Sequence, residues 1–454
     1  MAILLSLLFL QPSLVIRFPL LALGMFAAIA ALQIALRKQR TPVWTSKALA
    51  LTVTALSMDG VLGIALLLSS SDRTAVSVLT LVQPAVLACA WLLLWPVDHF
   101  LKQRTFTRAR TLRERHPELL VIGITGSVGK TTTKELLAHI LVDRHPLASP
   151  AHVNTEMGVA QWMQRALAPS PLPKGTPLIV EMGAYRTGEI ANLCSIVKPS
   201  IGIVTYIGSQ HLALFGSQET LLRAKGELLQ SLPPEGRAFL NGDCDLCHPM
   251  RTMAACPVTV VGTGGANDLE AFDIEETTTG IRFRVGDVVC AVPLHGTHNV
   301  ANILLAMAAA EHVGMPRNRI VEQLHTFRPP HRTFELRRDH GVLILDDTHN
   351  ASAASFKAAI AWAETQPYEH KVLLTSGIIE LGDEHERTHR ELGALASDVF
   401  GNVLFLDRKS ARFFEEGYGQ PVSLMGTDVA TLESGSLLVC VGRMSPSLIR
   451  RLLP

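Results

Sequence analysis

A glycine-rich stretch constrains this chain more than any other feature. Residues 123–135 read Gly-Ile-Thr-Gly-Ser-Val-Gly-Lys-Thr-Thr-Thr-Lys-Glu, between an apolar run at 119–124 and a helix-forming run that starts near Lys130. A strand, a glycine-rich turn and a helix in this order hold nucleotide phosphates, because glycines let backbone N–H groups turn inward and the helix start adds partial positive charge. Glycine is usual six residues before the lysine, where this chain has Ile124.

The predicted ligand of this stretch is ATP. We expect Lys130 to reach the terminal phosphates and the hydroxyl of Thr131 to hold Mg²⁺. The residues predicted to surround the nucleotide phosphates are Gly126, Ser127, Gly129, Lys130, Thr131 and Thr132.

The first hundred residues are much more apolar than the rest and raise the mean hydropathy to +0.27. A helix needs about 20 apolar residues to cross a bilayer. Residues 1–98 therefore predict a transmembrane region of three or four helices: Phe18 to Leu36, Ala48 to Ser70, Thr74 to Trp95 and, interrupted by Gln11 and Pro12, Ala2 to Ile16. The absence of basic residues in the first sixteen argues against a cleaved signal peptide.

Loop charges predict the orientation of these spans. Basic residues gather at 37–47 and 102–115, and the positive-inside rule places both groups in the cytoplasm. We therefore expect a multi-pass protein of the cell (inner or cytoplasmic) membrane, with the bilayer as a partner and catalytic domains in the cytoplasm. The second basic group either signals topology alone or also binds anionic lipid. Asp59, within a predicted span, either packs against another helix or has a functional role.

Total charge and cysteine content exclude other classes. With 41 basic and 40 acidic residues, the net charge of +1 gives no sign of a nucleic-acid partner. Seven cysteines in a cytoplasmic chain argue against a disulfide framework. Cys244 and Cys247, near His248 and Cys256, suggest zinc, but no second matching pair follows.

In a domain expected at residues 99–327, strand-like runs alternate with helical patterns from about 119 to 327, which predicts a mostly parallel sheet covered by helices. Ligands of such sheets gather at the carboxyl ends of the strands. Glu181 ends a buried strand and could meet Mg²⁺, whereas His211 and Lys225 look from spacing alone like a loop residue and a solvated lysine. The expected strands are 119–124, 178–181, 201–206 and 238–241, and the expected helices are 219–230 and 299–313.

Residues 328–454 predict a second, smaller α/β domain. Arg328-Pro329-Pro330 looks like the linker, because paired prolines stop a helix and favour extended chain. The expected elements are strands at 341–346, 372–375, 403–406 and 437–441 and a helix at 351–362.

Taken together, short motifs along residues 119–442 resemble the Mur ligase family, and within it the MurF type. Each motif is weak alone, but their order is specific. They are residues 126–133, 154–159 (Asn-Thr-Glu-Met-Gly-Val), 181–184, 211–212 with 215–217, 223–227 (Arg-Ala-Lys-Gly-Glu), 298–299 (His-Asn), 331–332 (His-Arg), 346–350 (Asp-Asp-Thr-His-Asn) and 380–382 (Glu-Leu-Gly).

This resemblance implies roles for residues whose spacing is ambiguous. It implies that Glu181 and His211 help to hold magnesium and that carbamylated Lys225 binds a second magnesium ion. It also implies that Asn299 lies near the adenine and that Asp347 bonds the ribose. Arg332 would reach the terminal phosphate, and His349 would lie near the phosphates or the acceptor.

The same resemblance implies a fold and a reaction. The fold would be a P-loop domain with a mostly parallel sheet and a smaller Rossmann-like C-terminal domain. The reaction would transfer the terminal phosphate of ATP to an acceptor carboxylate, forming an acyl phosphate that an amine attacks. We expect an amide ligase of cell-wall precursor synthesis that joins a nucleotide- or lipid-linked precursor to an amino acid or dipeptide.

Three departures from the family pattern leave the substrates open. Membrane spans replace the soluble domain that would hold the uridine diphosphate part of the acceptor. Asn154-Thr155 replaces paired asparagines, and Val441-Gly442-Arg443 replaces a lysine-glycine-serine segment. Alternatives are a ligase similar to capsular poly-γ-glutamate synthetases and a transport or regulatory ATPase, although a Leu-Ser-Gly-Gly-Gln transporter signature is absent.

Overall fold

A computed structural model gives the structure of the chain. It describes residues 28, 32–33, 44–69, 72–168, 172–208, 215–265, 267–277, 279–349, 351–379, 381–426 and 431–454. The chain separates into two compact units, Met1–Arg104 and Thr105–Pro454. The domain boundaries predicted at 98 and 327 stay predictions.

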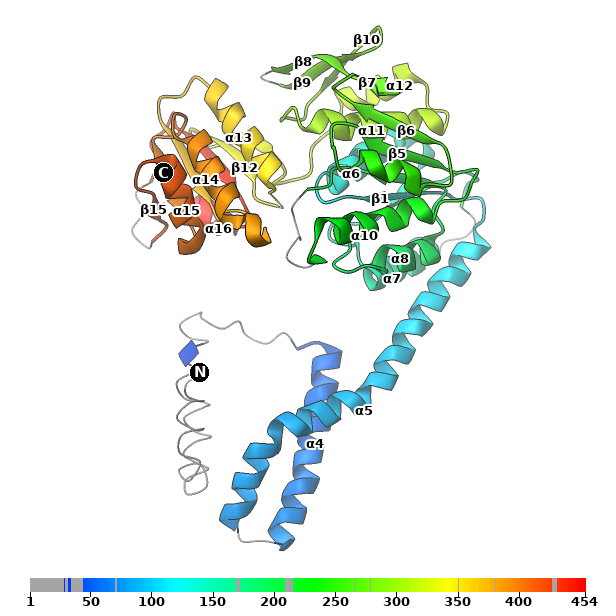
Figure 1. Ribbon diagram of the computed structural model, residues 1–454, viewed down its shortest axis with the longest axis vertical. Coiled ribbons are helices and arrows are strands. Elements are labelled where there is room, and N and C mark those ends of the chain that lie inside the picture. The colour runs from blue at the N-terminus through cyan, green and yellow to red at the C-terminus, as the bar shows by residue number, and fades with distance from the viewer. Residues whose placement is uncertain are drawn as a thin grey trace. The chain divides into compact units, whose positions relative to one another are not determined.

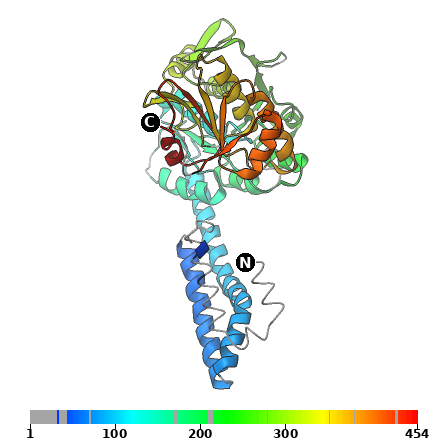
Figure 2. The same cartoon turned by 90° about the vertical axis from the view of Figure 1, so that its left-hand side faces the viewer.

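Most of the described part of the first unit consists of α4 (Ser46–Ser69) and the start of α5 (Asp72–Arg115). The two helices lie side by side (Figures 1 and 2) and pack through Ala55, Val86 and Ala90. Between them, the Gln83 amide donates a 2.8 Å hydrogen bond to Asp59, so Asp59 makes the helix-packing contact considered above.

Two helical stretches, Ser46–Leu66 and Val82–Arg115, are long and apolar enough to cross a membrane, by length and composition only. They overlap the predicted spans at 48–70 and 74–95. The other two predicted spans, 2–16 and 18–36, lie outside the described residues except for positions 28, 32 and 33.

A seven-stranded parallel sheet forms the centre of the second unit. Its order places β1 between β3 and β4, and every adjacent pair is parallel. The strands, in order across the sheet, are β2 (Leu147–Ala148), β3 (Pro177–Glu181), β1 (Leu120–Thr125), β4 (Ile201–Val204), β5 (Arg237–Asn241), β6 (Val258–Gly262) and β7 (Leu269–Glu270).

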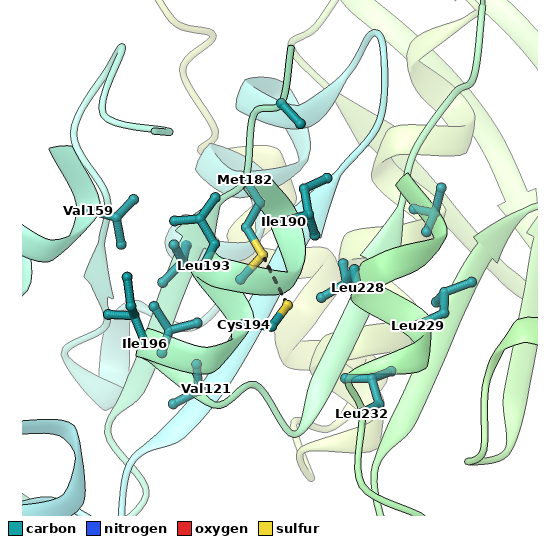
Figure 3. Packing of buried hydrophobic residues seen from close by; sticks show 14 of the residues in the cluster. Val121, Val159, Met182, Ile190, Leu193, Cys194, Ile196, Leu228, Leu229 and Leu232 are labelled. Atoms are coloured by element: carbon teal, nitrogen blue, oxygen red, sulfur yellow. Dashed lines mark hydrogen bonds between the residues drawn. The ribbon is translucent and has the colours of Figure 1, made fainter. Parts of the chain in front are cut away.

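Helices cover both faces of this sheet because strand residues alternate between two apolar cores (Figure 1). Val121 faces the core shown in Figure 3, where Leu193 and Leu228 contribute from two helices. Ile122 faces the opposite core. Helices α7 (Glu156–Ala166), α8 (Glu189–Val197) and α10 (Gln218–Gln230) cover the first face, and α6 (Lys130–Ile140), α11 (Asn299–His312) and α12 (Arg317–His325) cover the second.

An antiparallel sheet that the sequence analysis did not predict precedes α11. Its strands are β8 (Phe272–Thr277), β9 (Gly280–Val285) and β10 (Val288–Val292). The alternating side chains of β9 place Ile281, Phe283 and Val285 in the same core as α11. Short 3-10 helices occur at Val142–Arg144, His248–Met253 and Gly382–Glu384.

The C-terminal region contains a six-stranded sheet whose edge strand β11 (Glu335–Asp339) is antiparallel to β12 (Val342–Asp347). The remaining strands are parallel, with β16 (Leu437–Val441) between β12 and β13 (Lys371–Thr375). The other elements are β14 (Asn402–Phe405), β15 (Ser423–Leu424), α13 (Ala353–Thr365), α14 (His385–Ala396), α15 (Arg408–Tyr418) and α16 (Pro446–Arg450). The predicted class, a mostly parallel α/β protein with a second smaller sheet, is confirmed.

Candidate functional site

The glycine-rich turn joins the end of β1 to the start of α6. Gly126 and Gly129 have φ angles of 148° and 87°, which glycine adopts readily. An added side-chain carbon would lie 2.0 Å from Thr205 Oγ1 at Gly126 and 2.3 Å from Asn302 Oδ1 at Gly129. The backbone conformation and the close neighbours therefore both require glycine at these positions.

Lys130, the first residue of α6, turns back toward this loop. Its ammonium donates to the carbonyl oxygens of Gly126 at 2.7 Å and Ser127 at 3.0 Å. Burial lowers the pKa of Lys130. The N–H groups of Ser127 and Val128 donate to Tyr206 O, at 2.7 and 3.4 Å, so the segment after β4 supports the loop.

Glu181 ends β3 beside the loop, as strand-end reasoning predicted. Its carboxylate accepts hydrogen bonds from Thr131 Oγ1 at 2.9 Å and Asn154 Nδ2 at 3.2 Å. The buried Lys134 ammonium lies 3.9 Å from Glu181 Oε2 and donates to Ser149 O at 2.7 Å. Two side chains of α6 and one from the segment before α7 thus fix the direction of one carboxylate.

The Thr131 hydroxyl and the Glu181 carboxylate fit a magnesium ion. Both are oxygen ligands, and Mg²⁺ is usually held by one or two protein groups together with substrate phosphates and water. No cluster of three or more His, Cys, Asp or Glu side chains suited to a metal occurs in the described residues. His211, predicted as a further ligand, lies at 209–214, outside the described residues.

Lys225 lies on α10 and is only 1% exposed, which corrects its first interpretation as a solvated lysine. Burial and, second, the charge of Lys130 lower the pKa of Lys225 to about 7. Its ammonium lies 6.0 Å from the centre of the Phe215 ring. Nearby Glu227 instead accepts hydrogen bonds from the N–H groups of Gly188 and Ala191, at the start of α8.

Asn299 begins α11 and belongs to a chain of buried amides. Its Nδ2 donates to His295 O at 2.8 Å, and its Oδ1 accepts from Asn302 Nδ2 at 2.9 Å. Asn302 Oδ1 in turn accepts from Thr133 Oγ1 at 3.3 Å. This chain connects the phosphate loop to the residue predicted to lie near the adenine.

Asp347 ends β12 with one carboxylate oxygen paired and the other unpaired. Oδ1 accepts from the Phe334 N–H at 3.2 Å, and burial raises the pKa of Asp347 to about 6. In the described part of the chain, three buried polar atoms of this region have no hydrogen-bond partner: Asp347 Oδ2, His298 Nδ1 and Thr333 Oγ1. Burial lowers the pKa of His298 to about 4. A buried polar atom without a hydrogen bond lowers the stability of the fold, and a bound polar ligand would supply the missing hydrogen bonds. These unpaired atoms therefore fit a ligand-binding site.

The side chain of Arg332 forms its hydrogen bonds with residues of the C-terminal region and does not line the cavity described below. Its guanidinium donates to Thr348 Oγ1 at 2.9 Å, to Thr348 O at 3.3 Å and to Met444 O. The predicted contact of Arg332 with a terminal phosphate therefore stays a prediction.

His349 follows β12 and contacts a histidine of the central region. The rings of His152 and His349 lie 4.8 Å apart between centroids, tilted by 41°. Burial lowers the pKa of His349, as do the charges of His152, Arg332 and Arg443, whereas Glu181 raises it.

A cavity of about 330 Å³ brings these groups together. Of the predicted site residues, those that line it are Ser127, Gly129, Lys130, Thr131, Thr132, Glu181, Lys225, Asn299, Asp347 and His349. Gly126 and Arg332 do not line it, and His211 lies outside the described residues.

The lining residues that were not predicted as site residues include His152, Tyr185, Asn302, Ser355 and Arg443. The sequence could have indicated Arg443, because this residue comes two positions after the predicted strand 437–441. It could also have indicated Asn302, because this residue lies on the helix one turn after Asn299. His152 lies in an irregular segment, and its approach to His349 depends on tertiary structure.

The Cys244-Cys247 pair lies behind the segment that supports the loop. Both cysteines are free and buried. The Cys244 thiol donates to Ile207 O and the Cys247 thiol donates to Thr205 O, both at 3.5 Å. In the described residues, these cysteines therefore pack against the backbone and belong to no metal cluster.

Comparisons with known proteins agree with this geometry. The Mur ligase middle domain matches residues 124–310. The UDP-N-acetylmuramoyl-tripeptide–D-alanyl-D-alanine ligase of Bacillus subtilis (strain 168) is 31% identical over 303 residues, covering 65% of this chain and 64% of that protein.

Solved structures of MurF ligases are also similar to this chain. MurF from Acinetobacter baumannii superposes with a TM-score of 0.69 at 26% identity, covering 77% of this chain and 80% of that one. The MurF ligase of Thermotoga maritima in complex with ADP has a TM-score of 0.63 at 24% identity over 77% of this chain and 82% of that one, a likeness of fold.

The similarity to the curated relative is partial in length, since the chain spans 64% of the Bacillus subtilis protein. The matched domain contains the phosphate loop, Glu181, Lys225 and Asn299. Residues 124–310 therefore form a Mur ligase middle domain, and the chain is similar to ligases of the MurF type.

Proposed function

We propose that this protein is an ATP-dependent amide ligase that activates an acceptor carboxylate and joins it to the amine of an amino acid or dipeptide. The observation that carries the proposal is the shared cavity, in which Lys130, the Thr131–Glu181 pair and Lys225 all face one space. The Bacillus subtilis relative is named as a ligase of UDP-N-acetylmuramoyl-tripeptide and D-alanyl-D-alanine. A cell-wall precursor is therefore the proposed acceptor.

Each group has a physical task in this reaction. Transfer of the terminal phosphate of ATP to the acceptor carboxylate gives an acyl phosphate, which the amine attacks with release of phosphate. Lys130 offsets negative charge on the phosphoryl oxygens. Thr131 and Glu181 would hold Mg²⁺, which neutralises phosphate charge. Asn299 and Asp347 would bind the adenosine part.

Lys225 is proposed to carry a carbamate. Its lowered pKa, about 7, leaves much of the amine neutral at physiological pH. A neutral amine attacks carbon dioxide, forms an N–C bond and releases one proton. The resulting carboxylate would supply oxygen ligands for a second Mg²⁺. Lys225 lines the cavity, which is the space that a carbamate at its end would occupy.

The N-terminal unit is proposed to anchor the enzyme in the cell membrane with the ligase domains in the cytoplasm. The helices α4 and α5 support this proposal, since they expose large apolar side chains such as Leu56, Ile64 and Leu92. Anchoring would favour an acceptor that is itself carried by a lipid. A nucleotide-linked acceptor is the alternative.

A substrate-omission assay tests the ligase proposal. We expect release of ADP and phosphate from the full-length protein only when both the acceptor and the amine are present. Strong ATP hydrolysis with neither substrate would reject it. Mass spectrometry of lipid-linked and nucleotide-linked wall precursors in cells lacking the protein would identify the acceptor, because the pool that accumulates is the one consumed.

A further inference from the structure

We propose that Lys134 is a built-in counter-charge for Glu181, and that it makes the binding of a divalent cation at the Thr131–Glu181 pair depend on a bound nucleotide. This inference rests on the proposed function and deepens it, because it concerns how the cation enters the same site. Lys134 does not line the cavity, so we assign it a positioning role and no contact with substrate.

The ammonium group of Lys134 is enclosed by protein. The side chain lies on α6 and has no exposed surface, although a lysine is almost never fully buried unless it is paired. Its Nζ donates a 2.7 Å hydrogen bond to Ser149 O. A charged group removed from water destabilises the fold unless an opposite charge lies near it. The carboxylates around Nζ therefore decide what this lysine does.

Two carboxylates lie near Lys134 Nζ. Glu135 Oε1 is the nearer, at 3.1 Å, and Glu181 Oε2 lies at 3.9 Å. The side chain of Glu135 is 40% exposed, whereas that of Glu181 is 6% exposed. Water screens the first pair much more than the second. We therefore assign the larger electrostatic effect of Lys134 to Glu181.

Ser149 holds both members of this buried pair. Its carbonyl oxygen accepts the hydrogen bond from Lys134, and its Oγ accepts one of 3.0 Å from the Glu181 N–H. Ser149 is 1% exposed, and its own N–H donates to Ile179 O on β3 at 2.9 Å. The segment after β2 therefore keeps the ammonium and the carboxylate at a fixed separation.

Two other lysines act on Glu181, but each has another task. Lys130 and Lys225 both interact electrostatically with Glu181, and both line the cavity. Bound phosphates would attract Lys130, and a carbamate would remove the positive charge of Lys225. Lys134 is the one of these three lysines whose charge stays beside Glu181 when the ligands bind.

The carboxylate of Glu181 is already satisfied by the protein itself. Oε2 accepts from Thr131 Oγ1 at 2.9 Å and lies beside the Lys134 ammonium. Oε1 accepts from Asn154 Nδ2 at 3.2 Å. The charge of Lys134 also repels a second cation. Mg²⁺ is usually held by one or two carboxylates together with substrate phosphates, so the phosphates must supply the missing attraction and the cation would arrive with the nucleotide.

Titration of the full-length protein with Mn²⁺, followed by electron paramagnetic resonance, tests this role without turnover. When no nucleotide is present, we expect Lys134→Met to bind Mn²⁺ roughly tenfold more tightly than the wild type, because the repelling charge is lost. With ADP present the difference should be smaller, since phosphate charge then outweighs that of the lysine. Lys134→Arg should behave as the wild type does. Lys198→Met, which removes a 53% exposed lysine paired with Glu114, is the matched control and should leave Mn²⁺ binding unchanged.

The sign of the change separates an electrostatic role from a merely structural one. A site that only becomes looser when Lys134 is replaced would bind Mn²⁺ more weakly. Weaker or unchanged binding of Mn²⁺ by Lys134→Met without nucleotide would therefore overturn the proposal.

A stability comparison covers the case in which Lys134→Met does not fold. Removing one member of a buried charge pair destabilises a fold strongly, and removing the other member as well relieves the unpaired charge. The double variant with Lys134→Met and Glu181→Gln should therefore have a higher urea midpoint than Lys134→Met alone. An equal or lower midpoint would overturn the proposal. The predicted Mn²⁺ binding in a protein that forms no amide bond would instead reject the proposed function alone.

Discussion

Lys225 shows how the surroundings of a single side chain change its chemistry. From spacing alone it resembled a solvated lysine on a helix, but α10 buries it against the central sheet. Desolvation disfavours the ammonium form, so the pKa of Lys225 falls to about 7. Its neighbour Arg223, on the same helix, is 71% exposed and pairs with Glu219. Sequence periodicity could not separate the two with certainty, because burial depends on how the helix packs.

Replacement of Lys225 tests the carbamate. We expect Lys225→Ala to lower kcat at least a hundredfold, because a charge that holds Mg²⁺ in the transition state would be lost. Added formate or acetate should restore part of the activity by replacing the missing carboxylate. Arg223→Ala is the matched control and should retain near wild-type rates in the same assay. Full activity of Lys225→Ala would refute the assignment.

Asp347 links stability to pH. Its pKa is about 6 in the folded protein against 3.8 for an ordinary aspartate. A raised pKa means that the folded state holds the proton more tightly than the unfolded state. The carboxyl group of Asp347 therefore lowers the free energy of unfolding as pH rises from about 4, and this loss is complete above about 6. The shift corresponds to about 3 kcal/mol at pH 8.

Asp347→Asn should therefore increase the free energy of unfolding at pH 8, and the increase should shrink toward pH 4. The same variant should bind ATP more weakly, since Asp347 is the proposed ribose ligand. Urea unfolding at both pH values and nucleotide titration measure the two effects. Equal stabilisation at pH 4 and pH 8 would contradict the raised pKa.

The glycine-rich turn between β1 and α6 is the element whose geometry the sequence predicted best. The turn requires glycine at position 129, because this residue has a positive φ and lies against Asn302. Gly129→Ala should destabilise the fold by about 1–2 kcal/mol and weaken nucleotide binding, as the loop shifts away from Asn302.

Gly175 provides the control for this prediction. Its φ is +78°, and an added side-chain carbon would meet nothing within 4 Å. Gly175→Ala therefore adds backbone strain without a clash near the cavity, and it should leave nucleotide affinity unchanged. Thermal unfolding and nucleotide titration of both variants compare the effects. Equal nucleotide affinity of the two variants would show that the contact with Asn302 is unimportant.

Strand positions were predictable because buried parallel strands appear in the sequence as short, continuous runs of apolar residues. The run at 437–441 coincides with β16, and the run at 178–181 differs from β3 by one residue. The antiparallel strands β8 and β9 were missed because their runs contain many charged residues, such as Glu275 and Arg282, whereas β10, Val288–Val292, contains none and was missed without this reason. Those charges lie on the side away from the core, a fact that only the sheet register reveals.

At the scale of the whole molecule, the cavity combines residues that lie far apart in the sequence. The strand end predicted Glu181, since ligands gather at the carboxyl edges of parallel sheets, whereas Asp347 was predicted from the family resemblance. Nothing in the sequence places His152 against His349. The direction of Arg332 was also unpredictable, because its partners Thr348 and Met444 are 16 and 112 residues away.

The central claim is that this cavity activates a carboxylate by phosphoryl transfer. Oxygen labelling tests it most directly: the full-length protein is given ATP, the amine and an acceptor whose carboxylate contains ¹⁸O, and the released phosphate is analysed by mass spectrometry. The account predicts that one ¹⁸O atom appears in the phosphate for each amide bond formed, because the acyl phosphate breaks at its carbon–oxygen bond. Phosphate released without ¹⁸O during amide formation would contradict it.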